Sequence, residues 1–156
     1  MVRVLHRLML LLVLVAVQPM GAALAQVQFP QTPLQVIAAD GRRHDFTVEV
    51  ASSADQLAQG LMYRTKLAAT AGMLFDFGAP RSVAMWMKNT LIPLDMLFIT
   101  DNGRIAGISQ RAVPHSTVTI SSPGDVKAVL ELNGGTASRL GIKVGDRVMH
   151  PIFASH

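Results

Sequence analysis

Five residues in the middle of the chain have the types and spacing of a binding site. Trp86, Lys88, Asn89, Thr90 and Asp95 lie around a polar break between two apolar runs. Small-ligand sites are mostly apolar with a few convergent polar groups. A cation, an amide, a hydroxyl and a carboxylate beside the only Trp of the protein fit that description. We therefore predict that these five residues bind a ligand.

Period-two alternation predicts how these side chains meet. Trp86 and Lys88 fall on one face of a predicted strand over 82–87, and Asp95 lies on the next predicted strand, 94–100. If the two strands pair antiparallel, Lys88 lies opposite Asp95 and Trp86 floors an apolar pocket beside them. The alternative is an ion pair at two strand ends above a structural Trp, with no ligand involved.

Two other chemistries remain open. An enzyme could act through Asp95 and Lys88, with His115 as the one His considered for acid–base work. Thioethers bind Cu(I), so Met85 and Met87, together with Met73, Met96 and a His, suggest a minor copper-binding alternative, although methionines commonly fill gaps in cores. We predict no metal and no cofactor, because the sequence has no Cys and no paired-His metal motif.

Four further charged residues are predicted to support the structure. Glu49 or Glu131 is expected to face Arg64 in a bidentate pair that anchors a helix to the sheet. Asp146 lies in a Gly-Asp turn, where its carboxylate can accept hydrogen bonds from backbone amides across the turn. A structural module that supports only assembly or protein contacts is a third functional class that stays open.

Short alternating runs separated by turn signals predict a mainly β (α+β) fold, a compact barrel-like sheet with two short helices. Asp40-Gly41 links the first two strands, and a Gly-Ala-Pro turn separates two later ones. Ser52 or Ser53 is expected to cap the first helix. The predicted strands are 34–38, 43–51, 72–77, 82–87, 94–100, 104–110, 125–132 and 147–153. An irregular loop with one short strand is predicted over 113–122, and helices are predicted over 54–62 and 136–140.

The run from Gly72 to Thr100, GMLFDFGAPRSVAMWMKNTLIPLDMLFIT, resembles the signature of the domain-of-unknown-function 192 (DUF192) family. Shorter stretches match in order: VEVA at 48–51, GLMYR at 60–64, VLELNGG at 129–135 and GIKVGD at 141–146. The resemblance covers nearly the whole chain after residue 45 and implies a small domain that is often exported in prokaryotes. It implies no established activity.

The first 25 residues have the pattern of a secretory signal peptide. Arg3 and Arg7 precede a ten-residue apolar run, and Ala23-Leu24-Ala25 is an A-x-A cleavage motif. Ten apolar residues are too few to span a bilayer, which takes about 20. We predict cleavage after Ala25 without a stable membrane anchor afterwards, an extended leader over 26–33 and a single domain over 34–156.

Composition indicates the compartment and the partners. After cleavage, 12 Lys and Arg remain against 10 Asp and Glu. No basic cluster with interleaved aromatics occurs, which argues against nucleic acid as a partner. The chain has no Cys, so in an oxidising compartment packing rather than disulfides must stabilise it. We predict a periplasmic or secreted protein whose partner is a small molecule or an envelope component.

Overall fold

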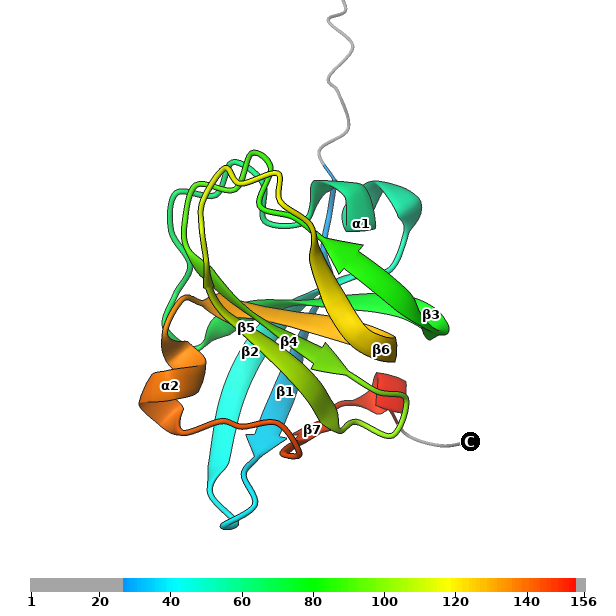
Figure 1. The fold of residues 1–156 in the computed structure, drawn as a ribbon, viewed down its shortest axis with the longest axis vertical. Coiled ribbons are helices and arrows are strands. Elements are labelled where there is room, and N and C mark those ends of the chain that lie inside the picture. Colours follow the sequence, from blue (N-terminus) through cyan, green and yellow to red (C-terminus); the bar gives the residue numbers. More distant parts are fainter. Residues whose placement is uncertain (1–26, 154–156) are drawn as a thin grey trace, which may run out of the picture.

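The computed structural model describes residues 27–153, so the predicted signal peptide lies outside the described range. These residues form one curled, seven-stranded sheet with two short α-helices, which confirms the predicted mainly β fold (Figure 1). The strand order is β5-β4-β6-β3-β2-β1-β7, and a bridge between Arg104 and Arg147 joins the two ends of the sheet. The elements are β1 (Gln31–Ile37), β2 (Arg43–Ala51), α1 (Ala54–Gln59), β3 (Ala71–Met85), β4 (Leu94–Ile99), β5 (Ile105–Ala112), β6 (Ile120–Asn133), α2 (Thr136–Leu140), β7 (Arg147–Met149) and the 3₁₀ helix η1 (Pro151–Phe153).

Alternate residues of β3, β4 and β6 point to opposite sides of the sheet. Each side is covered by its own apolar cluster, so both faces of these central strands are buried. The first apolar cluster draws on all seven strands and fills the inside of the curl; it includes Val48, Leu74, Leu97 and Leu130. The second cluster lies on the other face, where Leu57 of α1 and the following Leu61 cover it; it also includes Met73, Phe75, Met96 and Val129.

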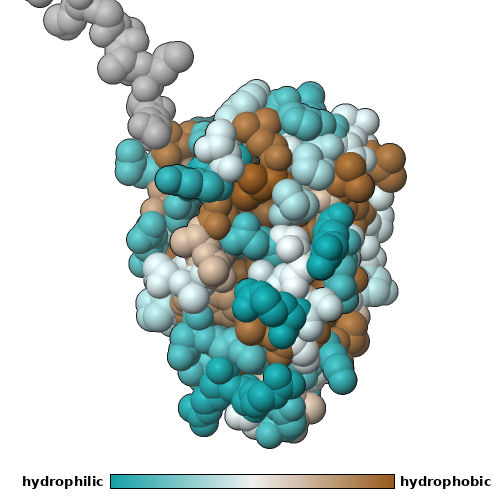
Figure 2. Space-filling view, turned by 90° about the vertical axis from the view of Figure 1, so that its left-hand side faces the viewer, coloured by the Kyte–Doolittle hydropathy of each residue, from teal (hydrophilic) through white to brown (hydrophobic). Residues whose placement is uncertain are grey.

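The two ends of the molecule differ in surface character. Helix α1 and the loops that precede β4 and β6 gather at the upper end in Figure 1, and the β1–β2 turn lies at the lower end. Figure 2 shows hydrophobic surface mainly toward the upper part of the face in view, whereas the lower end is hydrophilic. None of the helices in residues 27–153 has the length and apolar character that crossing a membrane requires.

Strand β3 is continuous where the sequence predicted two strands and a Gly-Ala-Pro turn. Its register against β6 shifts between Asp76 and Arg81, and Gly78 has a φ of 79°. The Gly-Ala-Pro segment is therefore a bulge, where Pro80 removes no regular ladder hydrogen bond. β6 is correspondingly long: it begins at Ile120, inside the predicted irregular loop, and pairs with both parts of β3.

Other boundaries shift for local reasons. Ser53 caps α1 as expected, since its hydroxyl accepts a hydrogen bond from the Gln56 amide at 3.3 Å. The helix ends at Gln59, three residues before the predicted end, because Gly60 leaves the helical conformation with a φ of 48°. A Cβ at Gly60 would lie 2.8 Å from the Phe75 ring, so a glycine suits this close approach. β1 begins inside the predicted leader. The predicted last strand is β7 followed by η1, because Pro151 has no amide to donate.

The predicted pairing of Lys88 with Asp95 is wrong. β3 ends at Met85 and pairs with β2 and β6, whereas β4 pairs with β5 and β6. Strand β6 thus lies between the two strands that were expected to be neighbours. Closeness in the chain favoured a direct pairing, but the long β6 offers hydrogen bonds to both strands and separates them.

Candidate functional site

Asp95 is fully buried, and its carboxylate accepts hydrogen bonds from backbone amides. One carboxylate oxygen accepts hydrogen bonds from the amides of Arg111 at 2.8 Å and Gly135 at 2.9 Å, and the other accepts from Ala137 at 2.8 Å. Gly135 and Ala137 begin α2, and Gly135 has no side chain with which to cap the helix. Asp95 therefore caps α2 from β4, and the structure does not bring it to the other predicted ligand-binding residues.

Trp86 and Thr90 instead meet Glu131 around a small crevice of about 40 Å³. One wall is α1 and the turn after it, which contribute Leu57 and Met62. The other wall is the end of β3 and the loop that follows. The sheet beneath contributes Glu131, the one ionisable side chain in the lining. Most of the lining residues are apolar, and Gln59, Thr90 and the Glu131 carboxyl add polar groups to the crevice.

Glu131 is buried among methionines. In the sheet register it lies between Met73 on β3 and Met96 on β4, and both are fully buried. Burial raises the pKa of the Glu131 carboxyl to about 8. Neither of the ion pairs found within residues 27–153 includes Glu131. At neutral pH the carboxyl is thus mostly protonated and free of a charged partner.

Glu49, rather than Glu131, is the partner of Arg64. The guanidinium donates two hydrogen bonds to the carboxylate, of 3.1 and 2.5 Å, and so ties the segment after α1 to β2. Glu49 lies opposite Met73, as Glu131 does on the other side. The two acids therefore flank one methionine on the same face of the sheet, with Cα atoms about 10 Å apart, and only one of them has a cation.

Strained backbone marks the mouth of the crevice. Of the four non-glycine residues with a positive φ within residues 27–153, three lie here: Tyr63 at 63°, Asn89 at 57° and His115 at 62°. The fourth, Arg111, lies beside Asp95. Such values are uncommon for non-glycine residues. The Tyr63 amide donates to the Asn89 carbonyl at 2.9 Å, and the His115 amide donates to the Thr90 carbonyl at 3.1 Å. Such strain concentrates at functional sites, because the surrounding structure must hold it in place.

Trp86 stands at this mouth, 53% exposed, and not on the floor of a pocket as predicted. It leaves the sheet because β3 ends at Met85. The exposed Lys88 places its Nζ atom 5.5 Å from the centroid of the Trp86 ring, within the range of a cation–π contact. The Asn89 amide nitrogen lies 3.9 Å from the Met62 sulfur. Four of the five predicted residues thus lie on the loop beside the crevice.

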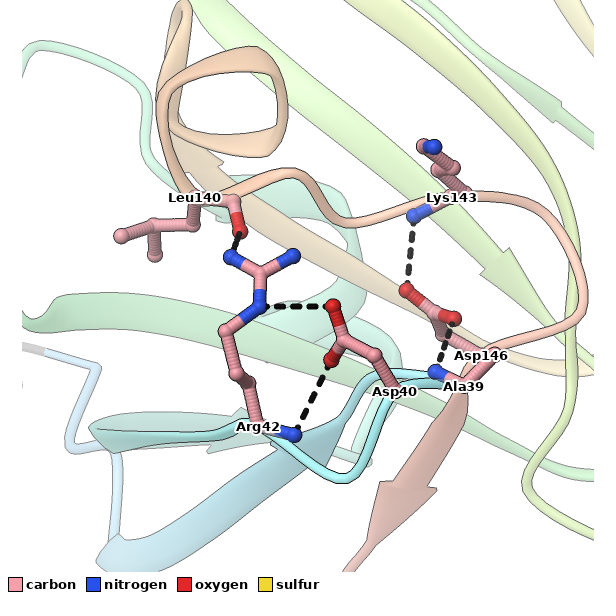
Figure 3. Close-up of polar contacts among 6 residues, drawn as sticks. All are labelled: Ala39, Asp40, Arg42, Leu140, Lys143 and Asp146. Atoms are coloured by element: carbon pink, nitrogen blue, oxygen red, sulfur yellow. Dashed lines mark hydrogen bonds and ion pairs between the residues drawn. The ribbon is translucent and has the colours of Figure 1, made fainter.

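Asp146 makes the contacts expected from its turn, as Figure 3 shows. Its carboxylate accepts hydrogen bonds from the amides of Ala39 at 3.0 Å and Lys143 at 2.8 Å. It thereby joins the turn before β7 to the turn between β1 and β2. Beside it, the backbone amide of Arg42, and then its guanidinium, hold the pKa of Asp40 below the usual value.

The described residues contain no group of three or more His, Cys, Asp or Glu that could hold a metal ion. Of the methionines considered for copper, Met87 is fully buried in the second cluster and Met85 packs against it. Their observed role is packing.

Three larger hollows, of about 590, 450 and 350 Å³, lie along β1 and β2, around β7 and η1, and between β2 and α2. The second includes His150, whose pKa is lowered by partial burial. We nevertheless place the candidate site in the smaller crevice. It combines a buried, unpaired acid with two of the residues predicted to bind a ligand.

The family model for DUF192, described as an uncharacterized ACR, matches residues 35–150. The chain belongs to the DUF192 family. This DUF192 domain is similar to a solved protein of Sinorhizobium meliloti that carries the provisional description of a transcription regulator. The two share 51% identity with a TM-score of 0.80, over 81% of this chain and 98% of that one. A solved Novosphingobium aromaticivorans protein of unknown function shares 39% identity with a TM-score of 0.75, over 86% and 91% of the two chains. No curated protein matches the sequence.

Sequence reasoning missed the position of Glu131 in this DUF192 domain. A signal was available in the run VLELNGG, where alternation places Glu131 on the same strand face as the apolar Val129. A lone acid on an apolar face needs either a partner or a raised pKa. The sequence made Arg64 a possible partner of Glu131, but in the structure Arg64 forms its ion pair with Glu49.

Proposed function

We propose that this DUF192 domain, once exported, binds a small molecule or an exposed group of an envelope component in the crevice between α1 and the loop after β3. The observation that carries the proposal is the buried Glu131 carboxyl, without a charged partner, in a crevice whose mouth holds the exposed Trp86. A few polar groups placed among apolar side chains are typical of sites that orient a small ligand.

The crevice is sized for an end group rather than for a whole ligand. Its volume of about 40 Å³ is close to the share of one water molecule in the liquid, about 30 Å³. The remainder of a ligand would lie outside, against Trp86 and the exposed Tyr63. Aromatic rings of this kind offer large apolar surface together with a polar edge.

The protonation state of Glu131 selects the chemistry of that end group. A neutral carboxyl both donates and accepts a hydrogen bond. A primary amide or a hydroxyl satisfies both functions without bringing a charge into apolar surroundings, which would be costly. Because the pKa of Glu131 is about 8, a group that accepts its proton should bind more weakly as the pH rises through that value.

An NMR titration with acetamide tests this proposal. Acetamide should shift the Trp86 indole N–H and the Thr90 amide resonances below the pKa of Glu131, and the shifts should fade above it. Glu131→Gln keeps a donor and an acceptor but does not titrate, so its binding should not change across this pH range. Glu49→Gln, on the same sheet face, is the matched control and should retain the parent pH profile.

Two results would count against a ligand site. One is the failure of acetamide, methanol and acetate alike to move the Trp86 resonance at mildly acid pH. The other is a pH profile that Glu131→Gln leaves unchanged. An enzyme acting through Lys88 and Asp95 is not favoured, because Lys88 is exposed at the mouth and Asp95 is buried beneath α2.

A further inference from the structure

We propose that three loops at the end of the domain that holds the crevice dock on an anionic lipid surface. The loop platform consists of residues 61–66, 86–91 and 113–118. The proposal concerns the outer surface of these loops and does not depend on a ligand in the crevice.

Exposed hydrophobic side chains gather on the loop platform. Within residues 27–153, seven large hydrophobic residues are exposed, and five of them lie on these loops: Tyr63, Trp86, Leu91, Val113 and Val118. Each is at least 37% exposed. Figure 2 shows hydrophobic surface concentrated toward this end of the molecule. Clustered exposed apolar residues mark an interaction surface rather than ordinary surface scatter.

Hydrogen bonds join the three loops into one surface. The Tyr63 amide donates to the Asn89 carbonyl at 2.9 Å, which links the first loop to the second. The Met87 amide donates to the Ser116 carbonyl at 2.9 Å, which links the second loop to the third. A surface that is ordered beforehand loses little conformational entropy when it docks.

The charges of the loop platform complement an anionic surface. Its three segments contain Arg64, Lys66 and Lys88 but no Asp or Glu. Glu49 neutralises Arg64, while Lys66 and Lys88 are exposed. Basic residues next to a membrane are attracted to anionic lipids. Trp and Tyr favour the headgroup level, where the ammonium of Lys88, beside the Trp86 ring, can reach lipid phosphates.

The aliphatic members of the loop platform favour lipid over nucleic acid. Single-stranded nucleic acid is held by aromatic stacking together with basic grooves, and Leu91, Val113 and Val118 offer no aromatic face for stacking. Aliphatic side chains do gain from insertion at the boundary between headgroups and acyl chains. The combination of three aliphatic residues, two aromatic residues and exposed lysines therefore fits a lipid surface better.

Fluorescence of Trp86 tests the proposal directly, because it is the only Trp in the sequence. The protein is mixed with vesicles of equal parts phosphatidylcholine and phosphatidylglycerol, with and without brominated acyl chains. Trp86 emission should shift to the blue, brominated lipid should quench it, and salt should weaken the effect. Pure phosphatidylcholine should bind less. Vesicles that capture the protein without quenching Trp86 would overturn the proposal, as would equal quenching by both lipid compositions.

Matched valine substitutions separate the loop platform from the rest of the surface. Val113→Ser combined with Val118→Ser should weaken vesicle binding about tenfold. The two valines would transfer apolar surface from water into the lipid on docking, and the serines would not. Val144→Ser replaces another exposed valine, 60% exposed against 67% for Val113 and 73% for Val118, in the turn before β7 and should have no effect. Glu131→Gln should also bind vesicles normally, which keeps this test independent of the crevice. Equal losses in the two valine variants would contradict a platform-specific contact.

Discussion

Asp95 on β4 and Glu131 on β6 are buried acids on neighbouring strands, yet their surroundings differ completely. Asp95 lies opposite Leu132 and Glu131 lies opposite Met96, so the two carboxyls face opposite sides of the sheet. Three backbone amides donate to Asp95, whereas burial alone determines the raised pKa of Glu131. Burial therefore does not by itself mark a functional acid. The hydrogen-bond donors available on each face determine whether the acid is structural or free.

The largest expected effect comes from Asp95→Ala. Removing the carboxylate leaves three amides without their acceptor, two of them fully buried. At about 1–3 kcal/mol for each unsatisfied buried group, the two buried amides alone should lower the free energy of unfolding by about 2–6 kcal/mol. Urea denaturation measures this change. A loss below about 1 kcal/mol would show that water or a local shift replaces the carboxylate.

Glu131→Gln should change how stability depends on pH. The folded-state pKa of about 8 lies above the ordinary value of 4.5, so the folded protein holds a proton that the unfolded chain releases between these values. The parent protein should lose stability as the pH rises through this window, by about 1.4 kcal/mol per pH unit. Glu131→Gln should lack this contribution and gain relative stability toward pH 8. Parallel stability profiles for the two proteins would contradict a buried, protonated Glu131.

Asp146→Ala should have an intermediate effect, because two backbone amides lose their acceptor and one of the contacts joins separate turns. The expected loss of unfolding free energy is about 1–3 kcal/mol, measured from the denaturation midpoint. Asp40→Ala in the neighbouring turn is the control, since both members of its ion pair are exposed, and it should change stability little. An unchanged midpoint for Asp146→Ala would reduce its role to that of a surface turn residue.

The smallest effect is expected for the Glu49–Arg64 pair. The side chain of Arg64 is 36% exposed and that of Glu49 18%, so water screens their attraction. A double-mutant cycle with Glu49→Gln and Arg64→Met should give a coupling energy of at most about 1 kcal/mol. A coupling several times larger would indicate that the pair shapes the α1 wall of the crevice in addition to tying it to β2.

Features set by neighbouring residues could be predicted from the sequence. Ser53 caps α1 from within its own turn, and Asp146 accepts the amide of Lys143 three residues away. The β1–β2 hairpin also follows from alternation around a tight turn. In each case the interaction partners are fixed by local spacing, so the pattern specifies the geometry.

Features set by distant strands could not be predicted in this way. Two of the backbone amides that donate hydrogen bonds to Asp95 lie 40 and 42 residues further along the chain. No local sequence pattern connects these amides with Asp95. The insertion of β6 between β3 and β4 removed the expected partner of Lys88. Both Glu49 and Glu131 suited Arg64 by charge, and only the three-dimensional arrangement assigned it to Glu49. The gathering of Trp86, Asn89 and Thr90 on one loop was local, and so it was predictable.

A direct titration of Glu131 tests the central claim that this acid lies unpaired in the crevice. The carboxyl carbons of ¹³C-labelled glutamate can be followed by NMR across the pH range, with Glu131→Gln assigning the signal. We predict a midpoint near 8 for Glu131. A midpoint near the ordinary value of 4.5 would show that the carboxyl is solvated or paired, and would contradict the proposed site.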